Sequence, residues 1–505
     1  MLHAFPLLSL LIWLPALAAV VLLAIGSRSL FLVRSIATLV AVLCCVLCIP
    51  LWQGFDSHSF AMQWVEHVDW IPALQIKYAL GVDGISMPLV ILSCFTTLVV
   101  ILASWTRVTE KVSQYLAAFL FTQSAVAGVF CATDAMLFYF FWEAMLIPMY
   151  LSIGIWGMEQ RSYAAMKFFI YTFFGSALLL IALVYLRMHS HSFDILGFYQ
   201  LTLTAPVQIV LFIAFLLAFA IKVPMWPLHT WLPDAHTEAP AGGSVVLAAL
   251  MLKLGGYGFL RFSLPIVPDA CRALDWMMIG LSLMAIVYIG FVALAQKDLK
   301  RLIAYSSVAH MGFVTLGCFM LFVVVERTGH TADALLGFEG AMVQMLSHAF
   351  SSGALFLAFG MLYHQIHSRD IASFGGVARS MPLFSAFFML FSMSNVGLPG
   401  TSGFVGEFMV ILSTFKASFW VTFLAASTLV VGASYTLTMY RRVFYGPIGS
   451  PTVASLSDIN GLDTLLFSLL GAAVIAIGVY PEPLLHVLHP TMKHLLALSL
   501  QSHLP

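Results

Sequence analysis

Charged residues are scarce in this chain, and their scarcity defines its class. Asp, Glu, Lys and Arg make up 9% of the 505 residues, whereas 61% are hydrophobic. Typical soluble domains carry about 25% charged residues. A water-soluble core is therefore excluded, and the composition predicts an all-α protein that crosses a membrane many times. Basic and acidic residues balance at 22 each, which gives no basis for nucleic-acid binding.

Motifs for nucleotides and redox cofactors are also missing. The sequence has no G-x-x-x-x-G-K-[ST] loop and no dinucleotide-binding fingerprint. It has no array of C-x-x-C pairs for an iron–sulfur cluster. Cys44, Cys45 and Cys48 lie in an apolar run without later partners at metal-site spacing, so packing is favoured over metal binding. We expect no cofactor and no metal in this chain, and an ion gradient or a partner as its energy source.

Fourteen apolar segments are long enough to span a bilayer, which takes about 20 residues. The first has no positively charged region before it and is longer than a signal-peptide core, so it is predicted to be a retained helix. The predicted segments are about 4–25, 30–52, 84–105, 115–132, 134–157, 165–187, 206–228, 244–262, 274–295, 301–325, 337–365, 384–418, 420–441 and 463–484.

Two of these segments contain helix-breaking residues. The seventh is interrupted at Lys222–Pro227 and the twelfth at Asn395–Gly403. Each is the fourth member of a block of five consecutive segments. Because five is an odd number, the two consecutive blocks enter the membrane from opposite sides. Interrupted helices at matching positions of inverted repeats indicate an ion site. The alternative is that Pro and Gly merely kink two packed helices.

The same pattern predicts the division of the chain. Residues 1–114 would hold three helices and an acidic outer loop, and residues 115–262 the first five-helix repeat. Residues 263–443 would hold the second, inverted repeat, and residues 444–505 a last helix and a tail. Thirteen Lys and Arg residues, Lys300 among them, are counted in one set of alternate loops, and seven, Arg261 among them, in the other. The positive-inside rule then places both termini on the outer side.

Four charged residues lie inside apolar segments: Glu143, Lys222, Lys253 and Glu407. An ionisable side chain at a bilayer centre costs at least about 2.5 to 3.5 kcal/mol, so such residues usually face the protein interior and carry function. Two acids and two bases suggest a proton path. Lys253 is followed by Gly255-Gly256, which permits close approach of a neighbouring helix. The alternatives are snorkelling for the lysines, one backbone partner for Glu143, and a helix-dipole partner for Glu407.

Histidines provide further relay candidates because imidazole titrates near physiological pH. His310 and His348 lie within spanning segments and are predicted to take part. For His229 and His236, which follow the first break, a role in packing and a role in proton transfer both stay open. Asp234 and Glu238, in the same stretch, are expected to face water or cap a helix.

Four runs of the sequence are distinctive: FYFFWEAMLIPMYLSIGIWG, AIKVPMWPLHTWLPDAHTEAPAGGSVVLAALMLKLGGYGFLRF, DLKRLIAYSSVAHMGFV and NVGLPGTSGFVGEFMV. They resemble the antiporter-like subunits of respiratory complex I, the NADH:quinone oxidoreductase. The resemblance covers about residues 80–445. Glu407 stands where the L and N subunits of that family typically have lysine, and the chain lacks the long lateral helix of L.

The resemblance implies a proton-translocating subunit of the membrane arm. Glu143 and Lys222 would form the entry pair, Lys253 the central relay, His310 and His348 the continuation, and Glu407 the exit group. NADH, FMN, iron–sulfur clusters and quinone would belong to partner subunits. The flanking subunits L and N, the small subunits J and K, and lipids would be its partners in a bacterial inner membrane.

Three other functions stay open at this point. The chain could belong to a multisubunit cation/proton antiporter or to an energy-converting hydrogenase. It could also be a structural spacer between other subunits, in which case Glu143→Gln would leave pumping intact.

Overall fold

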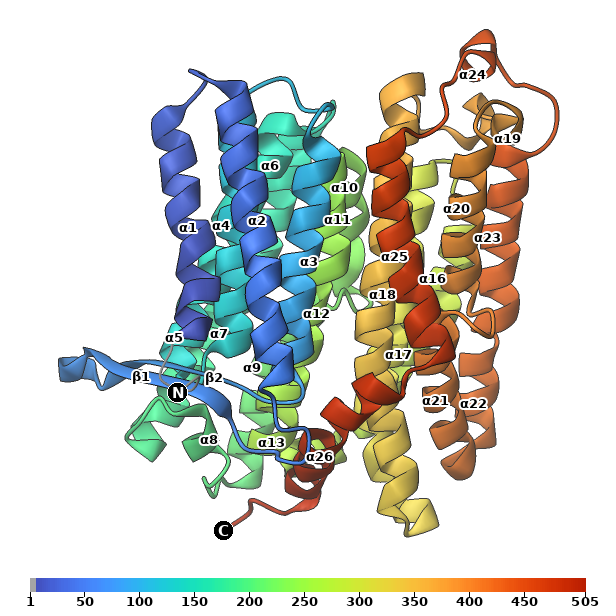
Figure 1. Cartoon of the computed structure of the whole chain (residues 1–505). Helices are drawn as coiled ribbons and strands as arrows, with labels where there is room; N and C mark the ends of the chain where they lie inside the picture. Colours follow the sequence, from blue (N-terminus) through green and yellow to red (C-terminus); the bar gives the residue numbers. More distant parts are fainter. Residues whose placement is uncertain (1–5) are drawn as a thin grey trace.

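The computed structural model describes residues 6–505, and helices dominate it (Figure 1). Thirteen helices in this part of the chain are long and apolar enough to cross a membrane. This confirms the predicted all-α, multi-pass fold. The helices that form these spans are α1 (Leu7–Ile25), α2 (Leu30–Gln53), α3 (Ser86–Ser104), α4 (Val112–Cys131), α5 (Ala135–Ala144) with α6 (Leu146–Trp156), α7 (Arg161–Ser190), α9 (Ala205–Lys222), α11 (Ala241–Val246) to α13 (Leu264–Ile266), α15 (Asp275–Leu283) with α16 (Ile289–Leu294), α17 (Leu299–Thr328), α18 (Thr331–Ile366), α22 (Phe419–Ala426) with α23 (Thr428–Phe444), and α25 (Gly461–Val479).

Both predicted breaks are present in the structure. Helix α9 ends at Lys222, and the chain resumes after an irregular stretch as α10 (Trp231–Glu238). The predicted twelfth segment is two shorter helices, α20 (Pro382–Val396) and α21 (Ser402–Ala417). Gly397 and Gly400 between them have φ of +80° and +88°, a backbone conformation that glycine adopts without steric cost. The breaks were therefore predicted at the right residues.

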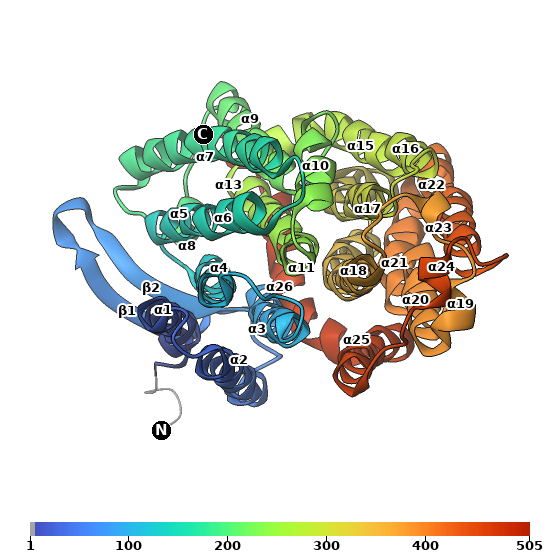
Figure 2. The same ribbon diagram turned by 90° about the horizontal axis from the view of Figure 1, so that it is seen from above.

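One span lies in the middle of the molecule and is buried throughout. It runs from α11 to α13 and includes α12 (Leu252–Gly258) and two π-helical turns, η4 (Leu247–Met251) and η5 (Phe259–Ser263). Every residue of its apolar window is buried inside the protein. Figure 2 shows α11 between the group around α4, α6 and α9 and the group around α17, α18 and α21. We refer to Ala241–Ile266 as the central helix.

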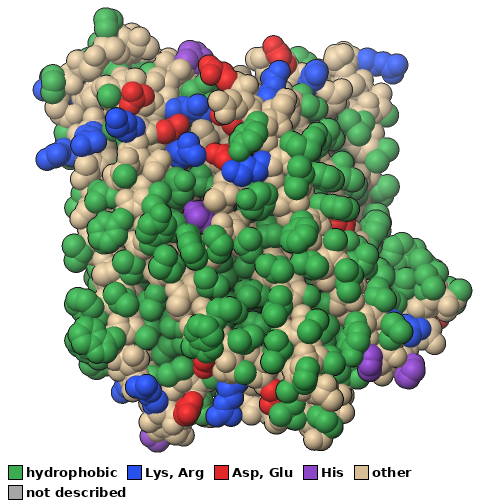
Figure 3. Space-filling model, turned by 180° about the vertical axis from the view of Figure 1, so that it is seen from behind, with side chains coloured by type: hydrophobic (Ala, Val, Ile, Leu, Met, Phe, Trp, Pro, Cys, Tyr) green, Lys and Arg blue, Asp and Glu red, His purple; other side chains and the backbone are tan. Residues whose placement is uncertain are grey.

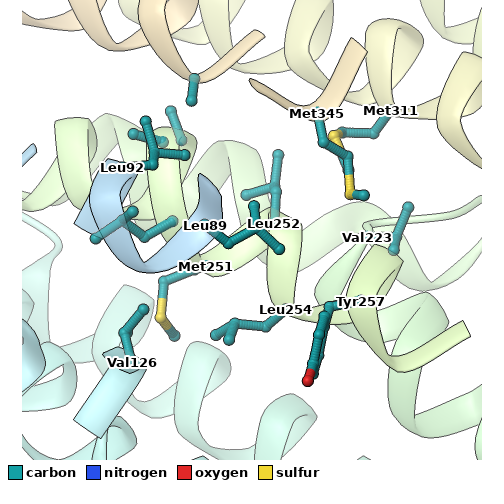
Figure 4. Close-up of a cluster of buried hydrophobic side chains, with 14 of the residues drawn as sticks. Leu89, Leu92, Val126, Val223, Met251, Leu252, Leu254, Tyr257, Met311 and Met345 are labelled. Atoms are coloured by element: carbon teal, nitrogen blue, oxygen red, sulfur yellow. The ribbon is translucent and has the colours of Figure 1, made fainter. Parts of the chain in front are cut away.

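Two glycines allow this close packing. A side chain at Gly255 would meet the carbonyl oxygen of Phe219 at 2.6 Å and the backbone nitrogen of Val223 at 2.8 Å, so α12 touches the last turn of α9 directly. Gly256 faces Met345 of α18 on the other side. Figure 4 shows the apolar side chains around α12, including Val223 and Met345. The close approach predicted from Gly255-Gly256 is confirmed.

Two elements that were not predicted from the sequence lie at the end of the bundle where α1 begins (Figure 1). Strands β1 (Gln63–Ile71) and β2 (Ile76–Val82) form an antiparallel hairpin in which Glu66 faces Leu80. The Glu66 carboxylate accepts hydrogen bonds from the backbone N–H groups of Leu8 and Ser9 and so caps α1. The second element is helix α26 (Glu482–Leu500), in the part predicted as a tail.

The remaining short elements join these spans. Figure 3 shows that apolar side chains cover the middle of the molecule, whereas charged side chains gather at its two ends. This distribution fits a bilayer around the middle of the bundle. The short elements are η2 (Pro72–Leu74), α8 (Ile195–Phe198), η3 (Leu228–Thr230), α14 (Pro268–Ala273), η6 (Met284–Tyr288), η7 (Ile371–Ser373), α19 (Val377–Ser380) and α24 (Pro451–Ala454).

Candidate proton-transfer site

The central helix contacts α18 through two of the predicted site residues. Lys253 Nζ lies 2.8 Å from His348 Nδ1 and donates to the carbonyl oxygen of Ala248 at 2.6 Å. Ala248 belongs to the π-helical turn η4, where the regular ladder of backbone hydrogen bonds is shifted. Lys253 is 0% and His348 2% exposed, so neither side chain reaches water or lipid. Snorkelling of Lys253 is thereby excluded.

A second contact joins α17 to α21. His310 Nδ1 lies 2.6 Å from Glu407 Oε1, and Gln344 Nε2 donates to the same oxygen at 3.0 Å. His310 is 4% and Glu407 3% exposed. Gln344 lies on α18 one turn before His348. The structure therefore holds Glu407 by two side chains from neighbouring spans.

The two contacts lie next to each other. The rings of His310 and His348 have centroids 5.9 Å apart, and the Nε2 atom of each ring is buried without a hydrogen-bond partner among the described residues. In the neutral rings, His348 accepts from Lys253 at Nδ1 and so carries its proton on Nε2. His310 donates from Nδ1 to Glu407 and so has a lone pair on Nε2. A donor and an acceptor thus stand unpaired on adjacent rings, an arrangement suited to proton transfer.

Glu143 and Lys222 lie near each other but do not touch. Lys222 Nζ lies over the ring of Trp142 at 5.2 Å and over that of Phe168 at 6.0 Å. It has no hydrogen-bond partner in the described chain, and neither has Glu143 Oε1. The two charges interact electrostatically, and Ser176 is close enough to interact with Glu143. The pair is thus an ionic pair without a direct hydrogen bond.

No hydrogen bond in the described residues links this pair to Lys253. Val223, the residue after Lys222, packs directly on Gly255 of the central helix, and Val223 and Leu254 both belong to the apolar cluster around α12 (Figure 4). The six predicted site residues therefore form two groups, Glu143 with Lys222 and the four others, with an apolar layer in between.

Two further buried basic side chains, His236 and Lys300, do not belong to the six predicted site residues. His236 is fully buried, stacks on Phe356 at 4.3 Å, and has no hydrogen-bond partner on either ring nitrogen in the described chain. It interacts electrostatically with Lys253 and Lys300. Lys300, counted from sequence as a loop charge, is 1% exposed and donates to the carbonyl oxygen of Ala239 at 2.5 Å. In the sequence, His236 in the run D-A-H-T-E was the feature that could have pointed to a further site residue.

The other residues after the first break mainly hold helices together. Glu238 was expected to face water or cap a helix, and it is buried. It accepts from the backbone N–H of Gln160 at 2.8 Å, which caps α7, and pairs with Arg369 at 3.1 Å. Asp234 pairs with Lys167 at 2.7 Å and with Arg301 at 3.0 Å. His229 is buried with Nδ1 unpartnered in the part of the chain that is described.

The cysteines and the acidic side chains show no arrangement of metal ligands. Within residues 6–505, no group of three or more His, Cys, Asp or Glu side chains is placed to hold a metal ion. All seven cysteines are free, and Cys44 and Cys48 are buried among apolar residues.

Comparison with known proteins assigns this architecture to a family. A family model described as "NADH:quinone oxidoreductase/Mrp antiporter, TM" matches residues 132–432. Another, "NADH-ubiquinone oxidoreductase chain 4, amino terminus", matches residues 10–133. NADH-quinone oxidoreductase subunit M of Rhodobacter capsulatus is 46% identical over 511 residues, 97% of this chain and 96% of that protein. The chain belongs to the subunit M family of respiratory complex I.

Further members of this family match over nearly their full length. Subunit M of Rickettsia conorii is 42% identical, over 97% of this chain and 99% of that protein. Chain 4 of the NADH-ubiquinone oxidoreductase of Marchantia polymorpha is 40% identical, over 97% and 96%. Glu407, at the position where subunits L and N typically have lysine, agrees with these names.

Solved structures agree with the assignment. A chain of respiratory complex I from Thermus thermophilus superposes with a TM-score of 0.87 at 29% identity, over 97% of this chain and 99% of that chain. A chain of the Mrp complex from a Dietzia species gives 0.80 at 19% identity, over 97% of this chain and 55% of that chain, which shows a shared fold alone. This chain is thus an antiporter-like subunit of the complex I membrane arm and part of a translocase. The predicted family and activity are confirmed.

Proposed function

We propose that Glu143, Lys222, Lys253, His348, His310 and Glu407 form a proton relay that works while other subunits oxidise NADH and reduce quinone. The observation that carries the proposal is the buried row of contacts from Lys253 through the two facing imidazoles to Glu407. Apolar side chains could fill the same space at a lower cost, because buried polar atoms without hydrogen-bond partners are unfavourable. Packing alone therefore does not explain the row.

Each step of the relay moves one proton between atoms close to each other. Protonated Lys253 gives a proton to His348 Nδ1, and His348 passes its Nε2 proton to the lone pair on His310 Nε2, directly or through one water. His310 then gives its Nδ1 proton to Glu407 Oε1. Lys253 and Glu407 regain their starting forms when a new proton arrives and the last one leaves. Each imidazole ends as its other tautomer, so both rings must tautomerise back before the next proton follows. Lys253 lies on the central helix, and His348, His310 and Glu407 lie on α18, α17 and α21.

The pair of Glu143 and Lys222 would supply the protons. Lys222 lacks a hydrogen bond that would hold its proton, and Glu143 stabilises its charge through space. A change in the charge of Glu143 would then lower the proton affinity of Lys222 and send a proton toward Lys253. The apolar layer at Val223 would need to admit water for this step.

The division of the chain into an N-terminal part (1–114), two inverted repeats (115–262 and 263–443) and a C-terminal part (444–505) belongs to this proposal. The breaks after Lys222 and Val396 support it, since they fall in matching spans. We further propose that subunits L and N flank this chain, with J and K nearby. Its place would be a bacterial inner membrane, with α1 starting on the periplasmic side. NADH, FMN, iron–sulfur clusters and quinone would be bound by partner subunits.

The test is proton pumping by the whole complex with Glu143→Gln. We expect NADH oxidation to persist and pumping per NADH to fall severely, because the amide that replaces the carboxylate can carry no charge to act on Lys222. The measurement is acidification of proteoliposomes per NADH oxidised, with assembly checked on native gels.

The matched control is Glu339→Gln. Glu339 is a buried glutamate of α18 that pairs with His489 and does not belong to the row. Its replacement should leave the proton yield intact. Normal pumping by assembled Glu143→Gln would favour a purely structural spacer and refute the relay.

A further inference from the structure

A second row of polar side chains leaves Lys253 in another direction. Lys253, Tyr257 and Arg261 follow one another at intervals of four residues on the central helix, and all three are buried. Residues at this spacing share one helix face. Arg261 Nε donates to the Tyr257 hydroxyl at 3.2 Å, and that hydroxyl donates to the carbonyl oxygen of Phe130 at 3.3 Å. The row runs toward the end of the bundle that carries α26.

The row ends at a buried ion pair. Arg261 Nη2 lies 2.7 Å from Asp83 Oδ2, and the two side chains are 7% and 2% exposed. The other carboxylate oxygen of Asp83 accepts from the backbone N–H groups of Ile85 and Ser86 at the start of α3. Both oxygens of the Asp83 carboxylate are therefore engaged, one by Arg261 and one by the start of α3.

Helix α26 covers this ion pair from outside. The backbone N–H of Gly84 donates to Thr491 Oγ1 at 3.1 Å, and the space at Gly84 admits no side chain because the Val487 carbonyl lies against it. His494 of α26 interacts electrostatically with Asp83. Tyr199 donates to the carbonyl oxygen of Arg261 at 2.9 Å. Helix α26 and Tyr199 thus both lie against the residues that form this end of the row.

We propose that Arg261 is a cationic barrier that keeps protons on Lys253 from escaping along this row to the α26 side. The guanidinium is always protonated, so it can neither accept nor pass on a proton. It lies between the Tyr257 hydroxyl and Asp83, so a proton that comes from Lys253 meets the positive charge before it meets the carboxylate. Protons must then leave Lys253 through His348. This inference deepens the proposed function and depends on Lys253 being a relay group.

The competing explanation is that the pair only fastens α3 to the central helix. A structural pair would affect stability and assembly but would not set the passive proton conductance of the complete, assembled complex. Passive conductance measured without NADH is therefore the decisive quantity. It does not depend on the driven relay, so its result stands apart from that of Glu143→Gln.

The experiment places the whole complex in proteoliposomes, imposes a pH gradient, and follows its decay with a trapped dye. The main variant is Asp83→Asn with Arg261→Gln, which removes the cation without leaving a buried carboxylate unpaired. We expect its gradient to decay at least several-fold faster than that of the wild type. Adding Tyr257→Phe to this variant should restore a tight membrane, because it removes the hydroxyl between Lys253 and position 261.

Two further variants distinguish the effect of the positive charge from the effect of the ion pair that holds α3 to the central helix. Arg261→Lys keeps a cation and should stay tight, and Asp83→Asn alone breaks the pair but keeps Arg261 and should also stay tight. A double variant as tight as the wild type would overturn the proposal. Equal proton leakage in Asp83→Asn and in the double variant would also overturn the proposal. The intact ion pair, and not the charge of Arg261, would then be the barrier to protons.

Discussion

The two halves of the molecule hold an acid and a base in opposite order. In the first half the acid, Glu143, lies in the span before α7 and the base, Lys222, lies at the break. In the second half the base, His310, lies on α17 and the acid, Glu407, follows the break. The first pair has no direct hydrogen bond, whereas the second is closed at 2.6 Å and held further by Gln344.

This difference assigns different tasks to the halves. An acid and a base that interact only through space can change each other's proton affinity while each exchanges its own proton. A carboxylate in a short hydrogen bond to an imidazole is held in one geometry, which suits the receipt of a proton at a defined atom. The pair of Glu143 and Lys222, which has no direct hydrogen bond, is suited to supplying protons to the relay. The hydrogen-bonded pair of His310 and Glu407, the closed pair, is suited to releasing them.

We expect the largest effect from exchanging the acid and the base of the first half, Glu143 and Lys222. The double variant Glu143→Lys with Lys222→Glu keeps one acid and one base, so we expect the complex to assemble. We expect pumping to fall to the background of the assay, because the acid would then stand at the break as in the second half. The measurement is the proton yield per NADH in proteoliposomes.

Either single replacement serves as a control for this swap. Each single variant places two like charges near each other and should assemble less well than the double variant. Wild-type proton yield in the double variant would mean that the order of acid and base has no role.

Loosening the closed pair tests the second half with a smaller effect. Gln344→Leu removes one donor to Glu407, and a hydrogen bond to a charged group contributes about 1.5 to 3 kcal/mol. We expect slower proton release and a pumping rate that falls several-fold, with NADH oxidation following it. Single-turnover kinetics of proton appearance outside the vesicle would measure the change. Gln365→Leu, a replacement at the end of α18 and away from the row, is the control.

The smallest effect is expected at Trp142. Its ring faces Lys222, and its Nε1 donates to Ser176 at 3.1 Å. Trp142→Phe keeps an aromatic face, and a cation–π contact contributes about 0.5 to 2 kcal/mol in total, so we expect pumping to change less than two-fold. Trp142→Leu removes the face and should slow pumping measurably more. Equal effects of the two replacements would show that the aromatic ring does not stabilise Lys222.

Hydropathy and helix breakers predicted the spans because both are local properties of the sequence. The break at Asn395–Gly403 needs only Pro and Gly in an apolar run, and α20 ends there at Val396. The hairpin β1–β2 was missed because neither Gln63–Ile71 nor Ile76–Val82 alternates polar and apolar residues over its length. Helix α26 was not predicted because its polar residues interrupt every long apolar window.

The site residues were predictable, but their partners were not. A charge inside an apolar segment is visible in the sequence, as at Lys253. The contact of Lys253 with His348 joins positions 95 residues apart, and only the packing of α18 on the central helix creates it. Arg261 and Lys300 were counted as loop charges, and both are buried. Position near a segment end does not tell whether another helix covers a side chain.

The burial of the central helix also constrains how the protein is made. In the finished molecule no part of Ala241–Ile266 faces lipid, yet α18, which covers one side of it, ends only at Ile366. At about 5 to 20 residues per second, synthesis of the intervening hundred residues takes roughly 5 to 20 seconds. During that interval the helix that carries Lys253 has no protein on its far side. Insertion must therefore shelter it, in the translocation channel or against the earlier helices, until α18 arrives.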